Sequence, residues 1–301
     1  LDALRVILLG PATAKTATGD RDGLYTNLYT LQGSAPYSAL AGTAQVTSFV
    51  DPSGKFASDI AMQAKVNNAQ GLATRYALVA INPFVLTGAD YSAFNSQGEL
   101  NLYDPAAGTG AITAQYLIDR SNLLECKLWF STEDRNPVDP SVVFDSNNPP
   151  FQNEDAYYED VATGYKIQQG GLFPNTHHYF FGGKDGDVAI GAALTDHLYG
   201  GAGNDTLTGK GGNDYLEGGQ GFDTYIINPG DGTDTLVDTD GLGVVKFGDI
   251  EANGSAGIDP EKWIHSTGTD TWTDTQNEIT YIRGVVDGET RLLVKKGESR
   301  A

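Results

Sequence analysis

The sequence predicts a mixed α and β fold, in which a mainly α-helical N-terminal region is followed by a right-handed parallel β-roll and a small β cap. Apolar residues recur at helical spacing up to about Glu133, glycine and aspartate recur every nine residues over 182–223, and polar and apolar side chains alternate after Trp272. We therefore expect four regions: a mainly helical region over 1–156, short connecting strands over 157–181, the β-roll over 182–240 and the β-rich cap over 241–301.

The amino-acid composition limits the classes of protein to which this chain could belong. The chain of 301 residues has 39 acidic and 19 basic side chains, and its net charge of −20 disfavours nucleic acid and anionic membranes and suits a protein that collects cations. The single cysteine, Cys126, has no partner for an internal disulfide. No apolar stretch approaches the length of a transmembrane helix, and the chain starts at Leu1 without a signal peptide. We expect a soluble fragment of a longer protein.

Three helices are expected in the first half. One covers 53–67, a second ends before Pro83, and a third covers about 112–131. On the third helix Leu117, Ser121, Leu124 and Leu128 form one stripe, with Cys126 beside it. A proline-rich loop is expected over 134–156, followed by short strands within 157–169 and 177–181.

The nine-residue repeat is the most specific signal. Its aspartates are Asp187, Asp196, Asp205, Asp214 and Asp223, and the last three units follow the pattern G-G-x-G-x-D-x-U-x almost fully. Six residues make a tight glycine turn whose carbonyls face a cation, and three form a short strand whose middle residue points inward. This pattern is typical of a calcium-binding parallel β-roll.

Calcium ligands are expected in stacked turns. Each coil contains two repeats, so turns two repeats apart stack, and the predicted aspartate pairs are 187 with 205, 196 with 214 and 205 with 223. A hard cation with six to eight oxygen ligands would remove the repulsion within each pair. The glycines of the site are Gly200, Gly201, Gly203, Gly209, Gly212, Gly218, Gly219 and Gly221. The first units are degenerate, because Asp185 replaces a glycine and Ala192-Ala193-Leu194 replaces G-x-G.

Metal is expected to drive folding of the roll. One buried apolar residue per repeat contributes about 2 kcal/mol, whereas ordering nine residues costs about 10 kcal/mol. Over 182–260 the chain has 14 acidic residues against three lysines, a charge that keeps the metal-free segment expanded. We expect this segment to be disordered without calcium and to fold at extracellular calcium concentrations.

Beyond the repeats, acidic turns continue in a changed register. Asp231 and Asp234 are expected to close the last site. An EF-hand at 238–241 is disfavoured, because Leu236 stands at its first ligand position. A hairpin about Asp287-Gly288 is expected within the cap, which would protect the open end of the roll.

The segment 182–234, with GGAGNDTLTGKGGNDYLEGGQGFDTY at its centre, resembles the repeats-in-toxin (RTX) family with its hemolysin-type calcium-binding repeats. Residues 75–124 and the later YYEDVATG resemble a region that precedes the repeats in large RTX proteins with a lipase-like domain further upstream. The resemblance implies a secreted bacterial protein, exported by a type I secretion apparatus, and makes 1–156 the tail of a lipase-like domain.

No catalytic residue is expected within this chain. It contains no G-x-S-x-G elbow. We expect His177 and His178 to be ordinary strand residues and Cys126 to be a small apolar core residue. The acidic pairs at 154–155 and 159–160 are expected to be solvated loop residues. Three parent proteins stay open: a lipase-like exoenzyme, a cytolytic toxin and an adhesin.

Overall fold

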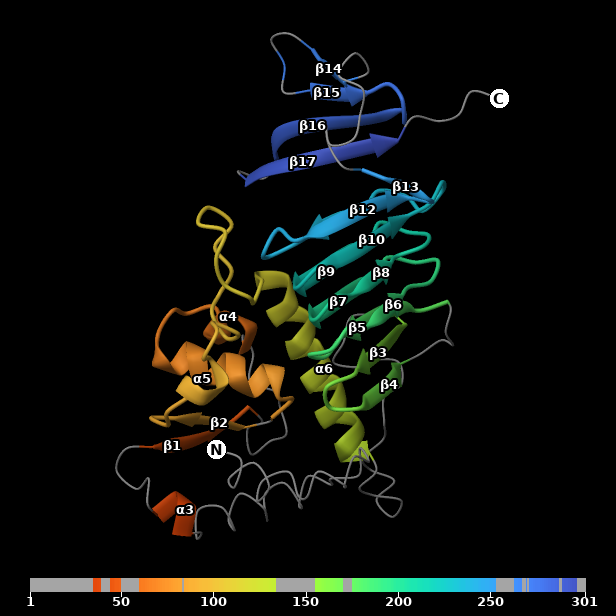
Figure 1. Ribbon diagram of the computed structural model, residues 1–301. Helices are drawn as coiled ribbons and strands as arrows, with labels where there is room; N and C mark the ends of the chain where they lie inside the picture. The colour runs from red at the N-terminus through yellow and green to blue at the C-terminus, as the bar shows by residue number, and fades with distance from the viewer. Residues whose placement is uncertain are drawn as a thin grey trace.

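The computed structural model describes residues 35–38, 44–49, 60–82, 84–133, 155–169, 175–252, 263–266, 269, 271–286 and 289–296. They form a helical part, a parallel β-solenoid and a separate antiparallel sheet, in chain order (Figure 1). The proline-rich loop expected over 134–156 falls almost wholly outside these residues. None of the described helices is both long enough and apolar enough to span a bilayer.

The helical part contains short helices around one long one. Its elements are α3 (Ala35–Ser38), β1 (Gln45–Ser48), α4 (Ile60–Ala64), α5 (Ala69–Val79), β2 (Phe84–Thr87), the 3₁₀ turn η1 (Ser92–Phe94) and α6 (Ala114–Glu133). Strands β1 and β2 pair antiparallel. Helix α5 begins where the Asn68 side chain accepts the Gly71 N–H at 2.8 Å, and it ends before Pro83 as expected. Helix α4 lies inside the helix expected over 53–67, of which 53–59 are outside the described residues.

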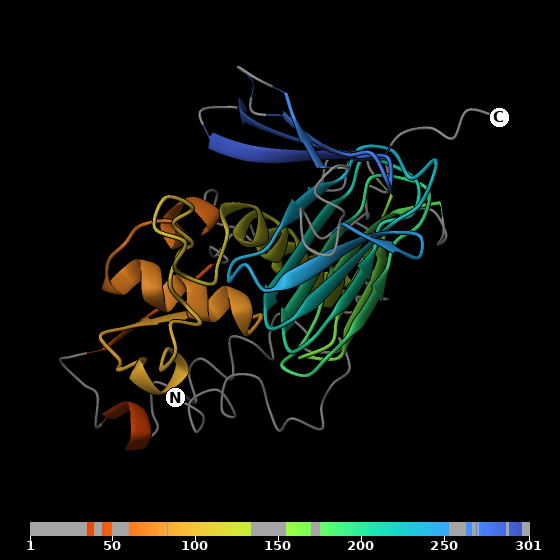
Figure 2. The same ribbon diagram turned by 45° about the horizontal axis from the view of Figure 1, so that its top comes forward.

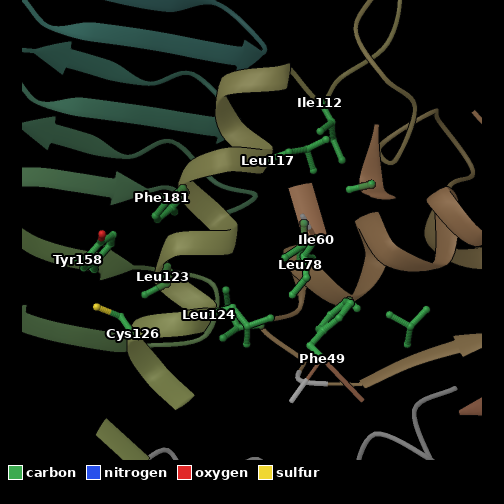
Figure 3. Close-up of a cluster of buried hydrophobic side chains, with 14 of the residues drawn as sticks. Phe49, Ile60, Leu78, Ile112, Leu117, Leu123, Leu124, Cys126, Tyr158 and Phe181 are labelled. Carbon is green, nitrogen blue, oxygen red and sulfur yellow. The ribbon is translucent and has the colours of Figure 1, made fainter. Parts of the chain in front are cut away.

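Helix α6 is buried on two sides. Leu117 and Leu124 belong to the apolar core shared with α4 and α5. Leu123 and Cys126 point instead toward the strands of the solenoid, beside Tyr158 (Figure 3). Leu117 and Leu124 of the expected stripe therefore lie on one face of α6, while the side chain of Leu128 is outside the described part. The second face was not predicted.

The solenoid is built from two parallel sheets that the chain visits alternately. One has the order β11-β9-β7-β5-β3-β4, and the other has the order β13-β12-β10-β8-β6. All pairs are parallel except β3 with β4 and β12 with β13, which are antiparallel at the edges. The strands are β3 (Ala156–Asp160), β4 (Tyr165–Gln169), β5 (His177–Phe181), β6 (Val188–Ile190), β7 (His197–Ala202), β8 (Thr206–Thr208), β9 (Tyr215–Gln220), β10 (Asp223–Ile227), β11 (Thr235–Val237), β12 (Gly243–Phe247) and β13 (Ile250–Glu251).

Between β5 and β10 the inside of the solenoid is filled by buried apolar side chains, one from each of these strands. Phe180, Ala189, Leu198, Leu207, Leu216 and Tyr225 form this core. The parallel β-roll expected from the repeats is confirmed, with the middle residue of each strand pointing inward. The coils span 156–247 and so extend on both sides of 182–240, because β3 stacks on β5 in the same parallel manner as β5 on β7.

The cap region forms a four-stranded antiparallel sheet of β14 (Trp263–His265), β15 (Thr271–Asp274), β16 (Ile279–Val286) and β17 (Glu289–Lys296). Val286 pairs with Glu289, so β16 and β17 form the hairpin expected about residues 287–288, which lie outside the described part. Figures 1 and 2 show this sheet beyond β12, at the C-terminal end of the solenoid.

Candidate metal centre

Each coil carries two glycine-rich turns, one on each edge of the roll. The turns are 182–187, 191–196, 200–205, 209–214, 218–223 and 229–234. Gly201 pairs with Gly219 on one edge, and Gly212 bridges Gly232 on the other. Turns that are two repeats apart therefore stack, and they place their aspartates on the same edge.

A ladder of hydrogen bonds joins the stacked aspartates. In each step the backbone N–H of one aspartate donates to the Oδ1 of the aspartate one coil later. The steps run from Asp187 to Asp205 (2.6 Å), from Asp205 to Asp223 (2.9 Å), from Asp196 to Asp214 (2.8 Å) and from Asp214 to Asp234 (3.0 Å). The structure thus brings together the three predicted pairs and adds a fourth.

The second carboxylate oxygen has no partner in four of these aspartates. The Oδ2 atoms of Asp205, Asp214, Asp223 and Asp234 are buried and accept no hydrogen bond. Burial of a bare carboxylate oxygen is unfavourable by about 1–3 kcal/mol or more. Four such atoms in stacked turns, beside glycine-rich backbone, fit a divalent cation that takes oxygen ligands.

The same surroundings perturb the protonation of the carboxylates. Burial raises the pKa of Asp205 to about 6, and it raises the pKa of Asp214 and of Asp223 to about 7. Neighbouring aspartates on the same edge contribute to these raised pKa values, among them Asp234 for Asp214. Without a cation, Asp214 and Asp223 therefore keep a larger share of the protonated form near neutral pH than an ordinary aspartate does.

The predicted glycines allow the turns to approach one another and their own aspartates. A Cβ on Gly219, which has φ +105°, would lie 2.1 Å from the carbonyl oxygen of Gly201 in the stacked turn one coil earlier. The backbone φ is also positive at Gly201, Gly203, Gly212 and Gly221. A Cβ on Gly200, Gly209 or Gly218 would lie within 2.4 Å of the Oδ2 of the aspartate in its own turn. Side chains at these positions would fill the space beside the unpartnered oxygens.

The first two turns differ from the rest. The Oδ2 of Asp187 accepts the Gly183 N–H at 2.7 Å, and the Oδ2 of Asp196 accepts the Ala192 N–H. We call 182–187 and 191–196 the closed turns, and 200–205, 209–214, 218–223 and 229–234 the open turns. Asp187 and Asp196 lie on the predicted edges, but their second oxygens are already bonded to protein.

The last turns follow a coil of 20 residues rather than 18. Asp234 continues the ladder, whereas the Oδ2 of Asp231 accepts the backbone N–H of Asn228 at 2.6 Å. Asp238 and Asp240 lie in the turn before β12, and their charges help to raise the pKa of Asp223. Asp240 also accepts the Gly221 N–H at 2.8 Å. From the sequence, both were considered only as part of a disfavoured EF-hand and were not placed at this site, although the acidic D-T-D run before Gly241 is a visible signal.

The donor set suits calcium. Among the described residues no group of three or more His, Cys, Asp or Glu side chains could hold a metal. A site in this roll would therefore combine one or two carboxylates with backbone carbonyls, and all of these are hard oxygen donors.

The other candidate residues from the sequence analysis contribute to packing and ion pairs. Cys126 is buried, and its burial raises the pKa of the thiol. His177 and His178 lie on β5, where His178 points into the roll and its Nδ1 lies 3.0 Å from the Ile190 carbonyl. The expectation of solvated loop acids at 159–160 is wrong, because both residues lie on β3. Glu159 pairs with Lys166 at 2.6 Å, and the buried Asp160 pairs with Arg120 at 2.9 Å.

Comparison with known families identifies the repeats. Residues 190–225 match the family described as RTX calcium-binding nonapeptide repeat (4 copies). The matched segment contains four turns, from 191–196 to 218–223, and leaves out the closed turn 182–187. No curated protein and no solved structure matches the chain.

Proposed function

We propose that this chain is the calcium-binding region of a type I secreted RTX protein, which folds and is stabilised when it meets calcium outside the cell. The observation that carries the proposal is the set of four buried, unpartnered Oδ2 atoms in the open turns. They lie within or next to the segment that matches the RTX repeat, whose known ligand is calcium.

Aspartates and glycines have separate roles in this proposal. Asp205, Asp214, Asp223 and Asp234 would each direct Oδ2 at an ion while Oδ1 stays in the hydrogen-bond ladder. The glycines would bring backbone carbonyls to the same ion, since their positive φ values rotate the peptide groups of the turn. Calcium tolerates such an irregular shell of six to eight oxygens, whereas magnesium demands a regular octahedron.

The proposal also covers the longer protein to which this chain would belong. The likeness of residues 75–124 to the region before RTX repeats supports a lipase-like exoenzyme, with its serine nucleophile outside this chain. A hemolysin-type toxin or an adhesin is the alternative. In each case the partners are calcium ions and a type I secretion apparatus, and the location is extracellular.

Calcium titration by isothermal calorimetry tests the proposal. Asp205→Ala and Asp214→Ala each remove a charged ligand, so we expect calcium affinity to fall by about tenfold or more, equal to about 1.4 kcal/mol. We also expect lower cooperativity, because each carboxylate bridges stacked turns. Asp249→Ala, which removes an exposed acid from the turn between β12 and β13, is the matched control. Wild-type affinity in both ligand variants would refute the assignment.

A further inference from the structure

The closed and open turns differ in backbone as well as in hydrogen bonding. The second residue of each open turn has positive φ: Gly201 (98°), Lys210 (70°), Gly219 (105°) and Gly230 (91°). Gly183 and Ala192, at the same position of the closed turns, are not among the positive-φ residues of the described chain. Lys210 adopts the left-handed conformation although it has a Cβ, which L-residues disfavour. The open form is therefore imposed by the coil rather than by glycine alone.

The coils that carry the closed turns are covered by α6. Phe181 of β5 and Tyr199 of β7 stack with their ring centroids 5.2 Å apart. Tyr116 of α6 packs edge-on against both rings, at 5.8 Å and 5.2 Å. Figure 3 shows Phe181 and Tyr158 on the strand side of α6, opposite Leu78 and Ile60 on the helical side. These coils share one apolar core with the helical part.

Buried charges connect the same elements. Arg120 pairs with Asp160 of β3 at 2.9 Å, and the two side chains are 2% and 1% exposed. One oxygen of Asp119 accepts the Tyr199 hydroxyl at 2.5 Å and lies 2.6 Å from the His197 Nδ1. Each of these groups needs its partner across the junction, because a buried charge without one is strongly destabilising.

Helix α6 makes fewer contacts with the strands that lead into the later open turns. The helical part reaches β9, where Thr113 donates to the Oε2 of Glu217 at 2.7 Å. A cavity of about 620 Å³ runs along this side of the roll, and its lining includes Asp185 of a closed turn as well as Glu217 and Gly219. The unpartnered oxygens begin at Asp205, in the turn that leaves β7. The aromatic and charged contacts with α6 thus centre on β3 to β7, and the unpartnered oxygens begin in the turn that leaves β7.

We infer that β3 to β7, with the closed turns and α6, form a nucleus that folds without calcium, and that β8 to β12 assemble on it as the open turns bind the ion. The inference rests on the proposed function, because it assigns calcium to the open turns. The inference adds that one half of the roll folds without calcium. Neither Asp187 nor Asp196 holds an ion by itself. In the nucleus, bonds from Gly183 and Ala192 take the place of the ion.

Hydrogen exchange of the whole chain in chelator and in millimolar calcium tests the inference. In chelator we expect the amides of β3, β5 and β7 to stay protected by about a hundredfold or more, and those of β8 to β12 to exchange at the rate of unfolded chain. Loss of protection in both halves, restored by calcium, would overturn the inference and leave the proposed function intact. Equal protection of β8 to β12 with and without calcium would contradict the proposed function itself.

Cys126 gives an independent readout. It is the only cysteine of the chain and is 0% exposed, between α6 and Tyr158. We expect its reaction with dithiobis-nitrobenzoate in chelator to be about a hundredfold or more slower than in guanidinium. Reaction at the unfolded rate would overturn the inference.

A matched pair of variants tests the role of α6. Arg120→Met removes the buried cation of α6, and Lys166→Met removes an exposed cation of β4 that pairs with Glu159 of β3. Protection of Cys126 should become calcium-dependent in Arg120→Met and stay calcium-independent in Lys166→Met. If Arg120→Met protects Cys126 in chelator as the wild type does, α6 does not hold the nucleus.

Discussion

In the open turns the two oxygens of one aspartate carboxylate have different surroundings. Oδ1 accepts a backbone N–H from the preceding coil, whereas Oδ2 is buried without a partner. The nine-residue repeat was enough to predict that Asp205 would stack with Asp223, because stacking follows from the length of the coil. It could not show that the Oδ2 of Asp187 is bonded to Gly183, because that bond depends on backbone geometry within one turn.

The raised carboxyl pKa values predict that acid partly replaces calcium. Aspartate in unfolded chain titrates near about 3.9, whereas the pKa of Asp214 and of Asp223 in the roll is about 7. The folded state therefore binds protons more tightly. This contribution to stability is complete below the unfolded pKa and is lost as the pH rises through about 7.

Circular dichroism of the calcium-free chain checks this prediction. We expect more β-sheet signal at pH 5.5, which is still above the isoelectric point of about 4.3, than at pH 8. The double variant Asp214→Asn, Asp223→Asn carries neutral side chains at both pH values, so its signal should change less. Identical wild-type spectra at the two pH values would show that these carboxyl groups do not limit folding.

At the scale of elements, the glycine turns and three-residue strands repeat with the sequence period. The middle residues Leu198, Leu207 and Leu216 were predicted to point inward, and all three are fully buried. The coil made by β3 and β5 was expected only as short strands, because its turns lack the glycine and aspartate pattern. Its stacking comes from aromatic side chains under α6, and their spacing carries no nine-residue signal.

Close contact between stacked turns predicts a difference between two glycines at the same turn position. Gly219 has φ +105° and its Cβ would meet the Gly201 oxygen at 2.1 Å, whereas Gly230 has φ +91° with nothing within 4 Å. Substitution of either by alanine adds about 1–2 kcal/mol of backbone strain. Gly219→Ala must in addition push two coils apart.

Thermal unfolding in saturating calcium measures the difference. The melting temperature of Gly219→Ala should fall below that of Gly230→Ala by several degrees. Equal melting temperatures would mean that the turns are not stacked as closely as the structure has them.

At the scale of the whole molecule, the roll is joined to the helical part by residues that are far apart in the sequence. Asp119 and His197 are separated by 78 positions, and neither belongs to a recognisable motif. From the sequence alone, an acidic residue on an amphipathic helix is predicted to lie on the solvent-exposed face. This junction could therefore not be predicted. The order of helices, roll and cap could be predicted, because each has its own periodicity.

The central claim is that calcium, held in the open turns, makes β8 to β12 of the roll fold. Far-UV circular dichroism of the whole chain at pH 8, in chelator, in millimolar calcium and in millimolar magnesium, tests it most directly. We predict that calcium adds β-sheet signal and that magnesium at the same concentration does not. A spectrum that is the same in chelator and in calcium would contradict the claim.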